Sequence, residues 1–317
     1  MRMSRWWLLC LLGSCVVLAE PGARPPGDQS ERDFWVANMV RHGFTVAEME
    51  AASGLAGPEI AVGLRALTPS PVAKREILEV WPYPGGRHPR LGFLDGAIDP
   101  QRETKVSVFM PWDRASYVVM DVPEALWSNL GLTYLAHTHV PTVWSQNEVG
   151  LPAYEWERLP NGELMMSRTL PNRLSFGSWV QPQKDHVAMV MWLHNGTRKV
   201  LSDLRVQNCV MLKGAPGFSG LTNDNKTIRK PFVACESEAG GKWVITAWEP
   251  CDRPWANAPV PCLHSDPKFP DTKPDEWQVL NGWLSFYEGD DVEAEFARIE
   301  KAWAKKSLKE VQAALTR

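Results

Sequence analysis

Two histidines two residues apart, His137 and His139 in the run LAHTHVP, are the sharpest chemical feature of this sequence. Residues two apart on a strand point to one face, so a strand over 132–140 projects both imidazoles together. A divalent metal suits such a pair, and so does acid–base work on a sugar. Alternatively, the two histidines are ordinary polar groups on a solvated sheet face. The spacing does not decide among a metal site, acid–base chemistry and this structural role.

The segment 248–276, WEPCDRPWANAPVPCLHSDPKFPDTKPDE, carries seven prolines and has no helical or strand period. We expect an ordered, stapled loop, because long structureless loops inside domains are usually functional. A carboxylate beside Trp loses solvation when charged, which raises its pKa and suits a general acid. Glu249, Asp252 and His264 therefore join His137 and His139 as predicted catalytic groups. Turn caps and ion pairs are the alternative role for these side chains.

Tryptophan is unusually frequent, with 16 Trp against 5 Tyr. Indole faces can stack on the C–H-rich face of a pyranose ring, and an Arg fork can bind a uronate or sulfate group. The alternative is a β-rich core built with Trp and a sheet with one wet face. The predicted substrate-binding residues are Arg102, Trp144, Arg205, Gln207, Trp248, Trp255 and Asp266.

The elements that must position these residues are mainly β. Runs that alternate in polarity or are rich in β-branched and aromatic residues predict antiparallel sheets packed face to face over residues 74–290. Residues 31–70 predict a small helical module with a capping box from Thr45 to Glu48, and 291–317 predict a C-terminal helix. The expected strands are 76–83, 104–110, 115–122, 132–140, 163–169, 173–180, 186–193, 204–212, 230–236, 242–248 and 277–287.

The first 19 residues resemble a signal peptide, with Arg2 and Arg5 before an apolar run that ends at Ala19. A Pro/Gly-rich linker over 20–30 follows. The run is too short to span a membrane comfortably, so we expect an exported protein, periplasmic or extracellular, without a membrane span in its mature form. The net charge of −3 gives no basis for nucleic-acid binding.

Export also predicts disulfides among the four cysteines that remain after cleavage. Pairing Cys251 with Cys262 would close the Pro-rich loop, and pairing Cys209 with Cys235 would join two predicted strands. Three pairings are possible, and the sequence does not choose among them.

The run HVAMVMWLHNGTRKVLSDLRVQNCVMLKG, residues 186–214, resembles the central strands of galactose-mutarotase-like β-supersandwich proteins. This resemblance implies an antiparallel β-supersandwich with a sugar groove. Aldose epimerases of that family place a catalytic His where this chain has Asn208-Cys209, so the resemblance does not extend to epimerase chemistry. AASGLAGPEIAVGLRAL resembles a helix-turn-helix, but its acidic surroundings favour packing over DNA binding. The whole chain also resembles a group of exported bacterial proteins, which implies no activity.

Together these features predict an exported protein that binds or acts on a carbohydrate in a Trp-lined groove. Acid–base chemistry would make it a hydrolase, a lyase or an epimerase. A non-catalytic carbohydrate-binding or surface-assembly protein is the first alternative. The second is an enzyme with a divalent metal cofactor centred on His137 and His139.

Overall fold

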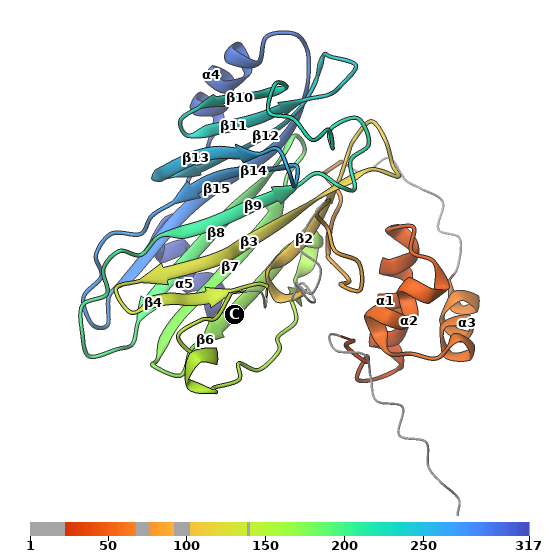
Figure 1. The fold of residues 1–317 in the computed structure, drawn as a ribbon, viewed down its shortest axis with the longest axis horizontal. Coiled ribbons are helices and arrows are strands. Elements are labelled where there is room, and N and C mark those ends of the chain that lie inside the picture. The colour runs from red at the N-terminus through yellow and green to blue at the C-terminus, as the bar shows by residue number, and fades with distance from the viewer. Residues whose placement is uncertain (1–22, 68–75, 92–101, 138–139, 317) are drawn as a thin grey trace, which may run out of the picture.

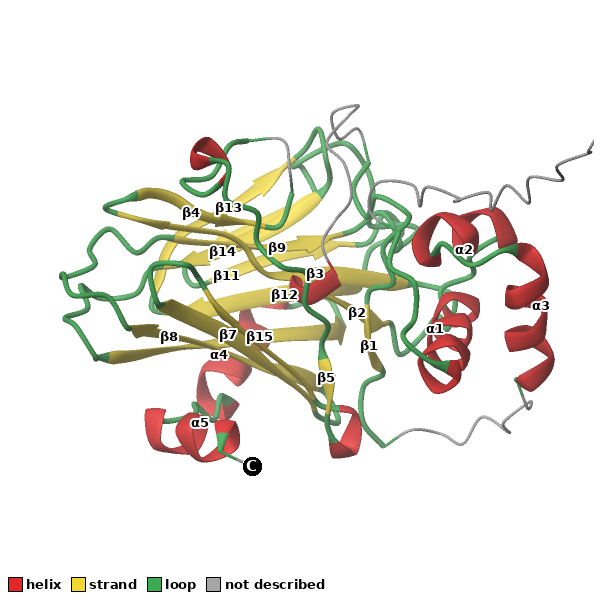
Figure 2. Ribbon diagram, turned by 90° about the horizontal axis from the view of Figure 1, so that it is seen from below, coloured by secondary structure: helices red, strands yellow, loops and turns green. Residues whose placement is uncertain are grey.

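The computed structural model describes residues 23–67, 76–91, 102–137 and 140–316. The predicted signal peptide and His139 lie outside the described residues. The described chain forms two antiparallel sheets packed face to face, with helices at their flanks (Figures 1 and 2). The predicted mainly β sandwich with helices at both ends is therefore confirmed. No helix in these ranges is long and apolar enough to cross a membrane.

The first sheet has seven strands and faces the viewer in Figure 1. β13 forms one edge, and β4 adds to the end of β3. Its order is β1 (Val80–Pro82), β2 (Lys105–Phe109), β3 (Tyr117–Ser128), β9 (Val206–Met211), β14 (Cys262–Pro267) and β13 (Cys251–Asn257), with β4 (Gly131–Leu135) paired to β3.

The second sheet has eight strands and lies behind the first. Its order is β10 (Lys226–Arg229), β11 (Phe232–Glu236), β12 (Lys242–Glu249), β15 (Trp277–Glu288), β8 (His186–Asn195), β7 (Leu174–Pro182), β6 (Leu164–Thr169) and β5 (Glu157–Arg158). Short 3₁₀ turns lie at η1 (Arg102–Thr104), η2 (Ser145–Asn147) and η3 (Pro160–Gly162).

The main core fills the space between the two sheets. Alternate residues of the central strands supply it, as a pleated strand requires. Val106, Val118 and Met120 of the first sheet belong to the same cluster as Phe176 and Met191 of the second. The intervening residues of the first sheet consequently point to its outer face, where the polar groups described below lie.

The N-terminal helices α1 (Gln29–Arg41), α2 (Val46–Ser53) and α3 (Gly57–Ala66) form a separate small bundle beside the first sheet, drawn in orange in Figure 1. The predicted capping box is present, with Thr45 and Glu48 bonded in both directions. Ion pairs fasten the bundle to the sandwich, among them Arg41 with Glu79, at 2.9 Å. The bundle therefore packs on the body of the protein, as its acidic composition favoured.

The C-terminal segment packs on the outer face of the second sheet as two helices, α4 (Val292–Ala302) and α5 (Leu308–Leu315), where a single helix was predicted (Figure 2). The chain leaves the helical conformation at Trp303, whose backbone is extended, and Ser307 caps a new helix. Phe296 of α4 packs with Trp243 and Trp283, which explains part of the high Trp content.

Two sequence predictions fail, one about the segment 248–276 and one about the cysteines. The expected loop is a hairpin, because β13 and β14 pair antiparallel from Cys251 to Pro267. Pro254 is tolerated because β13 is an edge strand, where a missing N–H costs no ladder bond. The expected disulfides are also absent, since the thiols at 209, 235, 251 and 262 are all free.

Candidate functional site

A row of five polar or aromatic side chains crosses the outer face of the first sheet, one from each of five adjacent strands. The strand registers pair Lys105 with Asp121, Asp121 with Cys209, and His264 with Trp255. The register of β14 on β9, continued by one residue, sets His264 beside Cys209. We call this row the polar ladder. Its members come from segments up to 159 positions apart, and the sheet alone brings them together.

Lys105 and Asp121 form a fully buried ion pair in the ladder, with Nζ and Oδ2 2.9 Å apart and neither side chain exposed. Burial raises the pKa of the Asp121 carboxyl to about 6, although the charge of Lys105 opposes the shift. A buried charge without a partner lowers the stability of the folded protein, so Lys105 and Asp121 each depend on the other.

Glu124 reaches the same face through a bulge in β3. Asp121 pairs with Cys209 and Ala125 pairs with Gln207, so β3 advances four residues where β9 advances two. Bulges of this kind change the direction in which side chains point. Arg90 contacts Glu124 at 2.5 Å, and Gln207 donates to it at 2.9 Å. Burial raises the pKa of Glu124, but the charges of Arg90 and His264 and the hydrogen bonds from Arg90 and Gln207 together outweigh it, and the net direction is downward. The neighbouring carboxyls are thus shifted in opposite directions.

His137 lies between these two carboxyls. Its Nε2 is 3.6 Å from Oδ2 of Asp121 and 3.6 Å from Oε1 of Glu124. The backbone sets this position, because the N–H of Ala136 donates to the carbonyl of Glu124 at 2.8 Å. The ring of His88 stacks on the outer side of His137, with centroids 5.7 Å apart. A histidine bracketed by two carboxyls with divergent pKa shifts is equipped for proton transfer.

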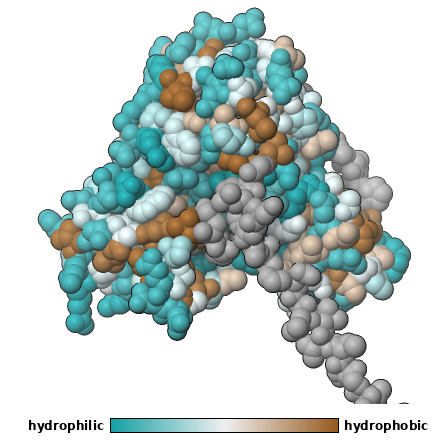
Figure 3. Space-filling model, in the orientation of Figure 1, coloured by the Kyte–Doolittle hydropathy of each residue, from teal (hydrophilic) through white to brown (hydrophobic). Residues whose placement is uncertain are grey.

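A cleft of about 540 Å³ opens beside His137. The described residues of its walls are mostly apolar, with the indole of Trp144 as an aromatic face and the hydroxyls of Thr142 and Ser145 as polar groups. The Trp144 indole is fixed by its N–H, which donates to the carbonyl of Thr133 at 2.7 Å. Figure 3 shows this face as largely hydrophilic, with several separate hydrophobic patches, one of them over the β4 end of the sheet. The cleft is thus lined by both the buried imidazole of His137 and the indole of Trp144.

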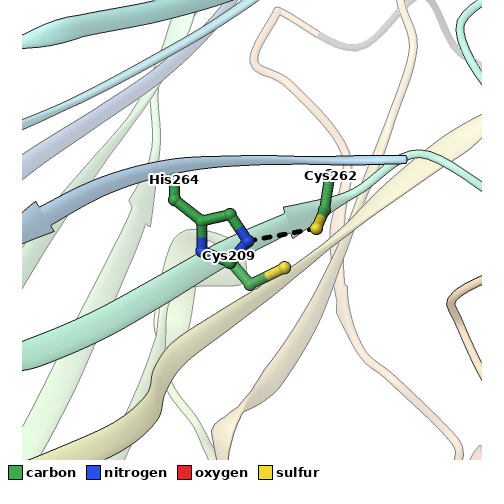
Figure 4. A group of neighbouring side chains, drawn as sticks. All are labelled: Cys209, Cys262 and His264. Carbon is green, nitrogen blue, oxygen red and sulfur yellow. Dashed lines mark hydrogen bonds between the residues drawn. The ribbon is translucent and has the colours of Figure 1, made fainter. Parts of the chain in front are cut away.

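The middle of the ladder holds the Cys209 thiol and the His264 imidazole, and a second thiol, Cys262 of β14, lies beside them. The ligand atoms of Cys209, Cys262 and His264 all lie within 4.8 Å of one another, and all three residues are buried (Figure 4). Cys262 Sγ is 3.0 Å from His264 Nε2. Burial lowers the pKa of His264, but the neighbouring Cys209 sulfur and the Asp266 carboxyl outweigh it and the net direction is upward.

The β13 edge of the ladder is held by Asp266. This carboxyl accepts from the indole N–H of Trp255 at 2.7 Å, from Arg253 at 2.9 Å and from the backbone N–H of Asn208 at 3.2 Å. The Trp255 ring stacks on His264 with centroids 3.9 Å apart. Trp255 and Asp266, both predicted to bind substrate, therefore support His264 instead of lining the cleft.

Among the predicted site residues, the structure groups His137, Gln207, His264, Trp255 and Asp266 along the ladder, with Trp144 in the adjoining cleft. His137 follows β4 instead of belonging to a strand, so the predicted strand over 132–140 ends early, at Leu135.

Other predicted residues lie elsewhere. Trp248 is 1% exposed and packs in the core between the sheets, so it forms no groove wall. Glu249 pairs with Lys305 near the C-terminal helices. Arg102 is buried under the helical bundle, where it donates to the carbonyl of Ala52 at 2.8 Å. Asp252 is exposed on β13, and Arg205 pairs with Asp203.

The sequence-based prediction missed Asp121, Glu124, Arg90 and His88. One signal was present: Asp121 interrupts the apolar run of β3, Tyr117-Val118-Val119-Met120-Asp121-Val122. A charge inside an otherwise apolar strand is rarely tolerated without a partner, so it marks a buried polar site. No comparable signal marks Arg90, which joins the site only through the fold.

No known protein-family model matches this chain, and no curated protein matches it. The functional argument consequently rests on the geometry of the site.

Proposed function

We propose that this protein binds a carbohydrate in the cleft beside His137 and acts on it by acid–base catalysis. The observation that carries the proposal is the position of His137, 3.6 Å from each of two carboxyls and in the wall of the cleft. Because the pKa values of the two carboxyls shift in opposite directions, a readily protonated group and a charged group lie beside the ring.

The aromatic wall supports a sugar as the ligand. Trp144 is partly exposed and held in place, so its indole offers a rigid flat face at little entropic cost. The C–H bonds of a pyranose stack on such a face, while the hydroxyls of Thr142 and Ser145 are within the same cleft to bind sugar hydroxyls. Export of the protein belongs to the same proposal and rests on residues 1–19.

The side chain of His137 is fully enclosed in the free protein. In the proposed chemistry its ring becomes accessible when the sugar binds, and it exchanges a proton with the sugar. Asp121 and Glu124 stabilise the imidazolium that forms when the ring takes a proton. Lys105 and Arg90 hold the two carboxyls in position. The geometry is compatible with hydrolysis, β-elimination and epimerisation, which all need a placed acid and base.

The test is to incubate the mature protein with a panel of neutral and uronate-containing polysaccharides and to follow three products. New reducing ends report hydrolysis, unsaturated ends absorbing in the ultraviolet report elimination, and solvent deuterium at a ring carbon reports epimerisation. We expect one of these signals, lost in His137→Asn and retained in His194→Asn, a matched change on the second sheet. Binding without any product would instead favour a non-catalytic carbohydrate-binding protein.

A further inference from the structure

We propose that Cys209, Cys262 and His264 form a binding site for a thiophilic divalent cation, with Zn²⁺ as the ion it takes. This goes beyond the carbohydrate cleft, because the three residues lie in the interior of the ladder and contribute nothing to the lining of that cleft.

The three side chains converge because of the strand pairing. Cys262 and His264 are two residues apart on β14, so both point to the outer face, and Cys209 reaches the same place from β9 (Figure 4). Their ligand atoms lie within 4.8 Å of one another, close enough for one ion to bridge all three with small side-chain adjustments. The rigid sheet therefore supplies a largely preformed site.

The orientation of His264 is the independent second observation. Its Nδ1 lies 2.7 Å from the carbonyl oxygen of Asn208, which can only accept, so Nδ1 carries the hydrogen. In the neutral ring the lone pair is then on Nε2, the nitrogen that faces Cys262 at 3.0 Å, and an ion that binds there replaces any proton on Nε2. Metal-ligating histidines are fixed in this way, with the second ring N–H donated to a carbonyl or carboxylate.

The ligand set selects the ion. Thiolate and imidazole ligands favour Zn²⁺ over Mg²⁺ and Ca²⁺, which prefer oxygen. Two thiolates neutralise a divalent cation, and Arg90 nearby is already balanced by Glu124. As each S–Zn bond forms, the thiol releases its proton to solvent. Nε2 of His264 releases the proton that it holds in the charged ring, so binding liberates up to three protons for each ion. Three protein ligands leave a fourth position for an exogenous ligand, as in catalytic zinc sites.

The experiment uses the full mature chain, reduced and stripped with a chelator, and titrated with Co²⁺ alone. We expect one ion per chain and a thiolate-to-cobalt charge-transfer band that added Zn²⁺ abolishes. Cys209→Ser and Cys262→Ser should lose this band. Cys235→Ser, which removes a buried thiol outside the cluster, should keep it.

A second measurement uses the unaltered chain, so that the proposal can be tested even if the cysteine variants fail to fold. Because Cys209 and Cys262 are buried, their alkylation is followed by mass spectrometry over hours, as the native protein opens transiently. Saturating Zn²⁺ should slow the alkylation of these two thiols and leave the labelling of Cys251 unchanged. A folded protein with no charge-transfer band and no selective protection would overturn the metal site. So would a Cys209–Cys262 disulfide in the protein as it is isolated, before any reductant is added. Because neither readout involves a sugar, failure here leaves the proposed carbohydrate activity standing.

Discussion

His42, which caps the C-terminal end of α1, and Ser107 on β2 are joined by a 2.6 Å hydrogen bond that fastens the helical bundle to the first sheet. The other ring nitrogen of His42, Nδ1, lies 2.8 Å from the carbonyl oxygen of Asn38. A carbonyl can only accept, so Nδ1 carries the hydrogen and Nε2 accepts from the Ser107 hydroxyl. The imidazole is thus bound in its neutral form, inside a cage of aromatic rings from both parts of the protein.

Acid should therefore weaken the folded protein through His42. Burial lowers the pKa of His42 to about 3, and Arg41 and Arg87 act in the same direction against the carbonyl of Asn38 and the charge of Glu79. Below pH 6.5 His42 takes up a proton in the unfolded chain, whereas in the folded chain it stays neutral until the pH approaches 3. The free energy of unfolding then falls by up to about 1.4 kcal/mol per pH unit between about 6.5 and 3.

Urea unfolding at pH 7.5 and pH 5 measures this effect. The unaltered protein should lose about 2 kcal/mol more than His42→Gln over this interval. Equal losses in the two proteins would show that the folded state does not exclude the proton.

A close approach at Gly86 should make that residue intolerant of any side chain. Gly86 has φ +70°, and a Cβ built there would lie 2.5 Å from the Cβ of Ala52 and 2.7 Å from its Cα. Gly43 has φ +66° with open space around it, so Gly43→Ala costs only the backbone penalty of about 1–2 kcal/mol. Gly86→Ala should cost roughly 1–3 kcal/mol more, because overpacking adds to that penalty.

Chemical denaturation of the two glycine variants compares them directly. Since Ala52 belongs to α2, the excess loss in Gly86→Ala would report the contact between the helical bundle and the loop that carries His88 and Arg90. Equal losses of stability in the two variants would mean that the loop shifts to make room for the added methyl group without loss of free energy.

The buried pair of Lys105 and Asp121 gives a prediction about stability alone. Lys105→Met leaves a carboxyl without its cation and should destabilise the protein by roughly 3–5 kcal/mol. The double change Lys105→Met/Asp121→Leu removes both charges and should recover most of that loss. Urea unfolding of the two single variants and the double variant supplies the cycle; additive losses would contradict a coupled pair.

Local signals in the sequence were sufficient for most of the elements. Strands such as 186–195 alternate or are uniformly apolar, and the capping box at Thr45 marks the start of α2 because its bonds are formed within three residues. The segment 248–276 defeated the same approach. Its prolines indicate a loop, but an edge strand tolerates proline, and the position of β13 at the edge is a property of the whole sheet.

The site was harder to predict because its geometry is non-local. His137 and Trp144 were identified from residue type, and they share the cleft. Their carboxyl partners Asp121 and Glu124 come from another strand, and the second reaches the site only through a bulge. Cysteine spacing left three disulfide pairings open, whereas strand register brings Cys262 toward Cys209.

The central claim is that the cleft beside His137 binds a carbohydrate against Trp144. Calorimetric titration of an oligosaccharide into unaltered protein, Trp144→Ala and Trp277→Ala tests it most directly, since Trp277 is a partly exposed tryptophan of the second sheet. Loss of the stacking face in Trp144→Ala should weaken binding by about tenfold or more, equivalent to about 1.4 kcal/mol. Trp277→Ala should bind as the unaltered protein does. Equal affinity in all three proteins, or weakening in Trp277→Ala alone, would contradict the account.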